Sequence, residues 1–344
     1  MDNIIIFDEK ISTYYFYNNI LRKSFEIYSL DRETPPILDM RKTQYITPSA
    51  VPVILSFGDY LRKLYKQPIE LLIGSESSLL NFIICSQFKS ISEKLQIFKI
   101  DKEIIESWNY KELRDLHKIS YTNIHYTDVD RIKNPVKKRD YIYDCLVDKS
   151  KAVYGKILQD THQLPINIID ATISSIAEIE TNSIIYSNSY SFTYVASDKY
   201  GTNISIADSG VGFERSFIKE KRKLNMVEKY QKLGPKFHNY LVIMSVLNYS
   251  YEKHLKDKRA DLWTLMTNVV KCNGIFKIQY GNTQVIFSQN SCKNCKRNEG
   301  KKDISSCVSC LLERQSEDSY SPIKLFGVGF QGVRIEIAVD KEED

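Results

Sequence analysis

The segment NISIADSGVGFERSF, from Asn203 to Phe217, contains the most informative pattern in the chain. Its first half alternates apolar and polar residues, which is typical of a half-buried strand. Asp208, Gly210 and Gly212 then form an Asp-x-Gly-x-Gly loop that leads into a charged segment. Glycines in such a loop let the backbone approach a ligand closely. The segment alone fits both an ordinary strand–turn–helix corner and a ligand-binding loop, so the residues around it must separate the two.

The upstream segment AEIETNSIIYS (177–187) belongs to a long helix expected over 168–187. Glu178, Asn182 and Tyr186 are spaced four residues apart and therefore share one face of that helix. A carboxylate and an amide on a mostly apolar helix are costly to bury without a purpose. The carboxylate can orient or deprotonate a water, and the amide oxygen can bind a hard cation such as magnesium. The alternative is that both side chains lie at the edge of the core and form local hydrogen bonds.

The order of this helix, a hairpin expected over 191–210 and the Asp-x-Gly-x-Gly loop resembles a known ATP-binding domain. It is the domain of the gyrase, heat-shock chaperone, histidine kinase and mismatch-repair (GHKL) superfamily, which has the Bergerat fold. AEIETNSIIYS is similar to that family's N box, and IADSGVGF is similar to its first glycine box. The resemblance implies that residues 140–344 form an α+β two-layer sandwich of Bergerat type.

The same resemblance implies a role for each motif residue. Asn182 is expected to hold magnesium, and Glu178 to activate water, as in the ATPase branches of the family. Asp208 is expected to accept a hydrogen bond from the adenine amino group. Gly210 and Gly212 are expected to let the backbone approach the nucleotide.

A second glycine box is expected in KRADLWTLMTNVVKCNG (258–274), where backbone amides and a helix N-terminus would meet the phosphates. The chain keeps Arg259, which is expected to contact ATP. Ala260 and Asp261, however, stand where relatives carry glycines. A Cβ restricts the approach of the backbone, and a carboxylate repels polyphosphate. Both substitutions are therefore expected to weaken nucleotide affinity and hydrolysis.

The end of the chain predicts strands interrupted by a metal site. IFKIQYGNTQVIFS (275–288) predicts a hairpin around Gly281 and Asn282, and VRIEIAV (333–339) predicts a closing strand. Between them lie two Cys-x2-Cys pairs separated by eleven residues, which are Cys292, Cys295, Cys307 and Cys310. Four thiolates at this spacing predict a structural zinc knuckle inserted at about 290–312. Basic residues among these cysteines could touch nucleic acid or an acidic partner, but solvated lysines are the commoner explanation.

The first hundred residues alternate expected strands and helices, which predicts a small α/β domain. ILDMRKTQYITPSAVPVIL (37–55) resembles the core of a STAS domain, the module of sulfate transporters and anti-sigma antagonists. Ser49 falls where such antagonists are phosphorylated, and it is also well placed to be the N-cap of a helix over 49–65. We therefore expect a STAS-like domain at 1–105 and a polar linker at 106–139.

Composition limits the remaining choices. The chain has 344 residues and a formal net charge of +5, which is too small an excess to indicate nucleic-acid binding. No apolar run is long enough for a membrane span, the N-terminus does not resemble a signal peptide, and the paired cysteines favour a reducing cytosol. A cytoplasmic protein without a membrane partner is expected.

Fusions of STAS-like and GHKL modules resemble bacterial signalling and stress-switch proteins. The expected function is an ATP-binding, ATP-hydrolysing conformational switch that acts on a protein partner or as a homodimer, with ATP, magnesium and zinc bound. One alternative is an anti-sigma-type kinase that phosphorylates a serine such as Ser49. The other is a non-catalytic scaffold whose zinc knuckle binds protein or nucleic acid.

Overall fold

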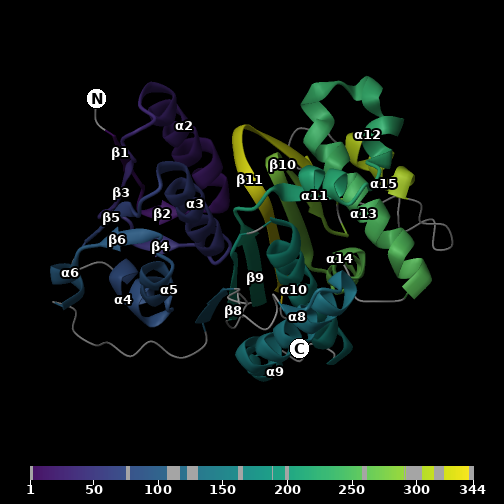
Figure 1. Cartoon of the computed structure of the whole chain (residues 1–344), viewed down its shortest axis with the longest axis horizontal. Coiled ribbons are helices and arrows are strands. Elements are labelled where there is room, and N and C mark those ends of the chain that lie inside the picture. Colours follow the sequence, from purple (N-terminus) through teal and green to yellow (C-terminus); the bar gives the residue numbers. More distant parts are fainter. Residues whose placement is uncertain are drawn as a thin grey trace.

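The computed structural model describes residues 3–74, 78–106, 117–121, 131–161, 166–187, 189–197, 201–257, 262–289, 291, 304–313 and 321–340. These residues form two units that lie side by side (Figure 1). The first unit contains a four-stranded parallel sheet and the second a five-stranded antiparallel sheet, in agreement with the α/β class expected from the sequence.

The N-terminal unit alternates strands and helices. Its sheet has the order β1-β3-β5-β6, with every neighbouring pair parallel. The strands are Ile4–Ile6 (β1), Ile37–Met40 (β3), Ile69–Ile73 (β5) and Phe98–Ile100 (β6), beside a short parallel pair, Lys10–Ile11 (β2) and Tyr45–Ile46 (β4). The helices are Thr13–Tyr15 (α1), a π-helical turn at Phe16–Ile20 (η1), Leu21–Leu30 (α2), Ala50–Tyr65 (α3), Ser78–Cys85 (α4), Phe88–Lys94 (α5) and Lys102–Glu106 (α6).

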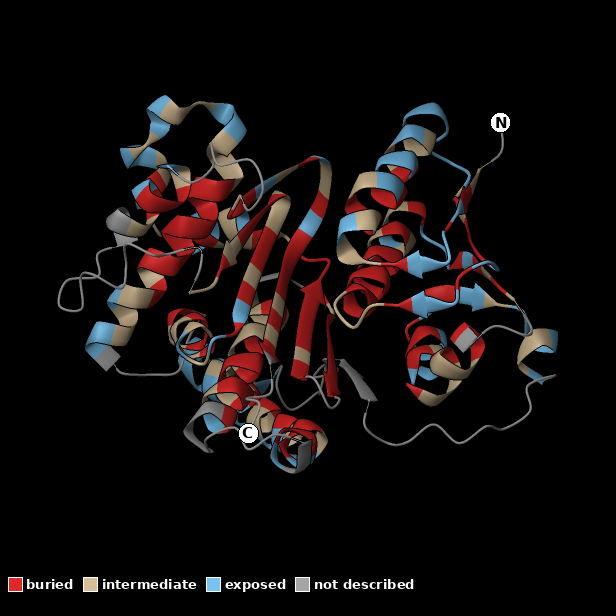
Figure 2. Ribbon diagram, turned by 180° about the vertical axis from the view of Figure 1, so that it is seen from behind, coloured by how far each residue is buried: buried red, intermediate tan, exposed pale blue. Residues whose placement is uncertain are grey.

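Helix α3 lies between the two units and is buried on most sides (Figure 2). Such a helix is expected to be apolar all round, and the run AVPVILSF has this character. The ring of Phe57 lies 5.2 Å from that of Phe16 and 5.4 Å from that of Phe330 in the second unit. The apolar core therefore continues from one unit into the other.

The predicted N-cap role of Ser49 is wrong. Its backbone is already helical, with φ −67° and ψ −25°, and its side chain accepts no capping hydrogen bond. An N-cap side chain normally reaches the amides of the second or third helical residue from an extended backbone, and here the third residue is Pro52, which has no amide hydrogen. The Ser49 hydroxyl instead accepts a hydrogen bond of 2.9 Å from Thr13.

The C-terminal unit has the sheet order β10-β11-β9-β8-β7. The strands are His117–Tyr121 (β7), Ser191–Ser197 (β8), Gly201–Asp208 (β9), Ile275–Phe287 (β10) and Ile323–Asp340 (β11). The helices that precede β8 are Pro135–Ser150 (α8), Lys151–Gly155 (η2), Lys156–Thr161 (α9), Ile166–Asn182 (α10) and Ser183–Ser187 (η3). Those that follow β9 are Gly212–Lys219 (α11), Asn225–Lys229 (α12), Gln231–Leu233 (η4), Pro235–Phe237 (η5), His238–Asp257 (α13), Leu262–Lys271 (α14) and Ile304–Glu313 (α15).

Both faces of the antiparallel sheet are covered. Phe192 and Tyr194 of β8 pack into the core shared with the N-terminal unit, whereas Val195 packs with the helices on the other face. Ile204 and Ile206 of β9 also belong to the helical side. This alternation follows from the two-residue period of a strand, and it explains why β8 and β9 are buried almost throughout (Figure 2).

Two strands differ from the expectation. The segment 106–139, expected to be a linker, contributes β7, which pairs with β8 at the edge of the sheet. The expected hairpin around Gly281 is wrong, because β10 continues through that residue and pairs with β11 on both sides of it. The register shifts at Gly281 mark a bulge, which has the glycine of a turn but does not reverse the chain. The hairpin of β8 and β9 and the closing strand β11 are confirmed.

Candidate functional site

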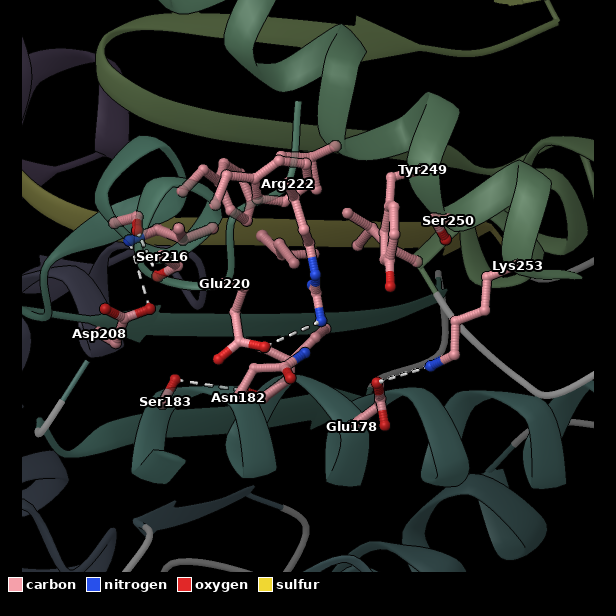
Figure 3. A pocket seen from close by; sticks show the side chains of 18 of the residues that line it. Glu178, Asn182, Ser183, Asp208, Ser216, Glu220, Arg222, Tyr249, Ser250 and Lys253 are labelled. Atoms are coloured by element: carbon pink, nitrogen blue, oxygen red, sulfur yellow. Dashed lines mark hydrogen bonds and ion pairs between the residues drawn. The ribbon is translucent and has the colours of Figure 1, made fainter. Parts of the chain in front are cut away.

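A cavity of about 160 Å³ opens on the helical side of the antiparallel sheet. Glu178, Asn182, Asp208 and Gly212 all line it, so the structure brings together four residues that sequence motifs had singled out. Figure 3 shows Asp208 at one end of the cavity and Glu178 at the other, with Asn182 between them on α10. The fifth motif residue, Gly210, contacts Asp208 through its backbone.

Asp208 ends β9 and is held by backbone amides. Its Oδ1 accepts a hydrogen bond of 2.8 Å from the Gly210 amide, and its Oδ2 accepts one of 3.3 Å from the Val333 amide. Burial raises the pKa of this carboxyl group, and these amides and the nearby Arg334 oppose the shift. The carboxyl group is thus fixed in one orientation in a place with little water, where it can distinguish a donor from an acceptor on a ligand.

Two glycines shape the surroundings of Asp208. Gly212 has φ 76°, and a Cβ there would lie 2.5 Å from the ring of Tyr280. Gly332 has φ 100°, and a Cβ there would lie 1.9 Å from the backbone oxygen of Asp208. Both positions therefore require glycine for conformation and for space. The sequence motif identified Gly212, whereas Gly332 lies in a strand-like segment whose pattern gave no sign of this contact.

The Glu178 carboxylate is paired with cations from two other helices. Its Oε1 forms an ion pair with Arg139 of α8, and the same oxygen lies 3.7 Å from Lys253 Nζ of α13. Arg139 also donates to Asn182 Oδ1 at 3.4 Å. Neither cation is evident from the sequence motifs, because both lie on other helices and only the tertiary fold brings them to the cavity.

The opposite wall of the cavity is largely apolar and aromatic. Phe213, Phe217 and Tyr249 line it, and the guanidinium of Arg222 lies 4.4 Å from the ring centroid of Tyr249. Glu220 lies 3.7 Å from Arg222, and both enter the cavity near Asn182 (Figure 3). The site therefore offers an apolar wall, a buried acceptor at one end and charged groups at the other.

The remaining predicted residues lie elsewhere. Ser49 is on the other face of the sheet, where its carbonyl oxygen accepts a hydrogen bond of 3.0 Å from Ser205.

Cys307 and Cys310 lie one turn apart on α15, and Cys310 is buried. Within the described ranges, no group of three or more His, Cys, Asp or Glu side chains is arranged to bind a metal. The predicted residues Arg259, Ala260, Asp261, Cys292 and Cys295 lie outside the described residues.

Comparison with protein-family models, with curated proteins and with solved structures found no match to this chain. Among the helices that the structure describes, none combines the length and apolar character needed to cross a membrane.

Proposed function

We propose that this chain binds magnesium-ATP in the cavity between α10 and the loop after β9 and acts as an ATP-dependent conformational switch. The observation that carries the proposal is that Glu178, Asn182, Asp208 and Gly212 line one cavity. The resemblance predicts that these four residues meet at one site. The distance between the motifs in the sequence does not by itself ensure that they do.

Each end of the cavity suits one part of the nucleotide. The Asp208 carboxylate accepts the adenine amino hydrogen, and Gly212 presents backbone without a side chain on the cavity wall. The amide oxygen of Asn182 suits a hard cation such as magnesium, which would offset phosphate charge when bound. Phe213, which directly follows Gly212 and lines the cavity, gives the planar base an apolar surface to lie on.

Hydrolysis needs a base, and we assign this role to Glu178. Its carboxylate accepts a proton from water while the water oxygen bonds to the γ-phosphorus. The bond from that phosphorus to the β,γ-bridging oxygen breaks, and ADP and phosphate are the products. Arg139 and Lys253 hold the Glu178 carboxylate at the cavity wall on the helix that carries Asn182.

The experiment that tests binding is a calorimetric titration with a non-hydrolysable ATP analogue and magnesium. We expect saturable binding to the wild type and much weaker binding to Asp208→Ala. Absence of heat with folded wild-type protein would refute the proposal. For hydrolysis, phosphate release is compared between the wild type and Glu178→Gln, and equal rates would remove Glu178 from the mechanism.

The switch part of the proposal is supported by the contact between the two units. The loop that carries Asp208 touches α3 of the N-terminal unit, so a nucleotide that alters this loop acts on both units. A protein partner or a second copy of the chain would read this change, as in bacterial signalling or stress responses. We also propose, as part of this switch, that the N-terminal unit is a STAS-like domain.

We also propose a structural zinc site formed by the two Cys-x2-Cys pairs. Cys307 and Cys310 are three residues apart on α15 and therefore lie on one side of that helix. Together with Cys292 and Cys295 they would supply four thiolates, which suits a closed tetrahedral site with no catalytic role.

A further inference from the structure

Two cations from different helices converge on one carboxylate oxygen at the Glu178 end of the cavity (Figure 3). Arg139 of α8 and Lys253 of α13 both contact Glu178 Oε1, the latter at 3.7 Å (Figure 3 shows Lys253). All three side chains line the cavity and are at most about a quarter exposed. Charges held out of water in this way interact more strongly than surface pairs.

The position of Arg139 indicates which part of a bound ligand contacts the two cations. Arg139 also reaches Asn182 Oδ1, which is the atom proposed to hold magnesium. Phosphates that share this magnesium must therefore lie beside Arg139. An arginine presents a planar fork of donors to phosphate oxygens, and a lysine adds a compact charge.

The sequence gives an independent reason for phosphate-binding side chains. Ala260 and Asp261 occupy positions where glycine amides are expected to meet phosphates. A chain that lacks those glycines needs other donors, and Arg139 and Lys253 lie on the cavity wall.

We infer that Arg139 and Lys253 form the subsite for the phosphate chain of a nucleoside polyphosphate, and that they hold Glu178 until the phosphates displace it. This inference rests on the proposed function. Phosphates and Glu178 compete for the same two cations, so ligand entry loosens the carboxylate from its ion pairs. Glu178 then becomes able to accept a proton only when a substrate is present.

The test is calorimetric and needs no turnover. Affinities for adenosine, ADP and a non-hydrolysable ATP analogue, each with magnesium, are measured on the wild type, Arg139→Gln and Lys253→Gln. We expect both variants to lose roughly tenfold or more in affinity for the ATP analogue, less for ADP and nothing for adenosine. Arg139→Lys keeps the charge without the fork, so it should lose less than Arg139→Gln.

Matched controls lie on the same two helices. Lys137→Gln on α8 and Lys256→Gln on α13 change exposed lysines that do not line the cavity, and they should bind all three ligands as the wild type does. Glu178→Gln removes the competitor for the two cations and should therefore tighten binding of the ATP analogue. A purely structural ion pair would have the opposite effect, because the cations would lose their partner.

The outcomes separate the inference from the proposed function. If the wild type binds the ATP analogue and Arg139→Gln and Lys253→Gln bind it equally well, the subsite is wrong and ATP binding stands. An equal loss for adenosine and ATP would also overturn the subsite, because it would show general damage to the cavity. If the folded wild type binds none of the three ligands, the proposed function fails as well.

Discussion

The hydroxyl group of Ser209 donates a hydrogen bond of 2.6 Å to the carboxylate of Asp59, and this bond joins the two units. Asp59 is fully buried in α3 and also pairs with Arg62 and Lys63, each at 2.7 Å. Ser209 directly follows Asp208, the residue proposed to bind adenine. A displacement of Asp208 would therefore reach α3 through the buried Ser209–Asp59 contact.

Ser209→Ala should destabilise the protein, because it leaves the buried Asp59 carboxylate without one of its donors. A hydrogen bond to a charged group contributes roughly 1.5–3 kcal/mol, so the free energy of unfolding should fall by about that amount. Urea denaturation measures the change. Ser29→Ala is the control, since its hydroxyl bonds an exposed helix carbonyl and its loss should change little. Equal stability of Ser209→Ala and the wild type would contradict a coupling through this contact.

The sequence predicted which segments form strands better than it predicted which strands pair with one another. The parallel strands of the first unit and the pairing of β8 with β9 follow from local patterns of apolar residues and turns. By contrast, β7 lies in a polar segment with little periodicity, and it is a strand because the edge of β8 offers a hydrogen-bonding partner. Gly281 shows a related limit, since glycine is compatible with both a turn and a bulge and only the pairing with β11 decides between them.

For the site, short motifs identified Glu178, Asn182 and Asp208, because helical spacing and a glycine loop are local features. They could not identify Arg139 and Lys253, which reach Glu178 only when the fold brings α8 and α13 to the same cavity. The contacts of distant residues depend on tertiary packing, which one sequence does not encode in any short pattern.

Gly332→Ala should damage both stability and ATP binding. The new Cβ would lie 1.9 Å from the Asp208 backbone oxygen, so either β11 or Asp208 must move. A residue other than glycine at φ 100° also costs about 1–3 kcal/mol through backbone strain. Thermal unfolding and calorimetric titration with the ATP analogue measure the two effects. Gly327→Ala, in the same strand, meets no atom within 4 Å and should leave both quantities close to those of the wild type.

The proposed zinc site predicts bound metal in the purified protein. Elemental analysis should find zinc, and Cys307→Ser or Cys310→Ser should remove it. Cys85→Ser, in α4 of the other unit, is the control and should keep the metal. A chelator should lower the melting temperature of the wild type, because a structural zinc contributes to folding. Zinc-free wild-type protein with unchanged stability would exclude the site.

The raised pKa of Asp208 predicts a pH dependence of ATP binding. Burial raises this pKa above that of an ordinary aspartate, so the side chain takes up a proton at a higher pH. The ionised carboxylate accepts the adenine amino hydrogen, and protonation removes part of that capacity. Affinity for the ATP analogue should therefore be constant above the raised pKa and should fall as the pH decreases through it.

Without ligand, the same shift has the opposite effect on stability. Between the ordinary pKa and the raised one, the folded protein binds more protons at Asp208 than the unfolded chain does, so the free energy of unfolding decreases as the pH rises through this window. Asp208→Asn does not titrate and should lack this contribution in urea denaturation at a series of pH values. The pH dependence of ligand binding that remains in Asp208→Asn then measures the contribution from protonation of the nucleotide itself. If wild type and Asp208→Asn showed the same pH profiles in both measurements, Asp208 would have neither the shifted pKa nor the role in adenine binding.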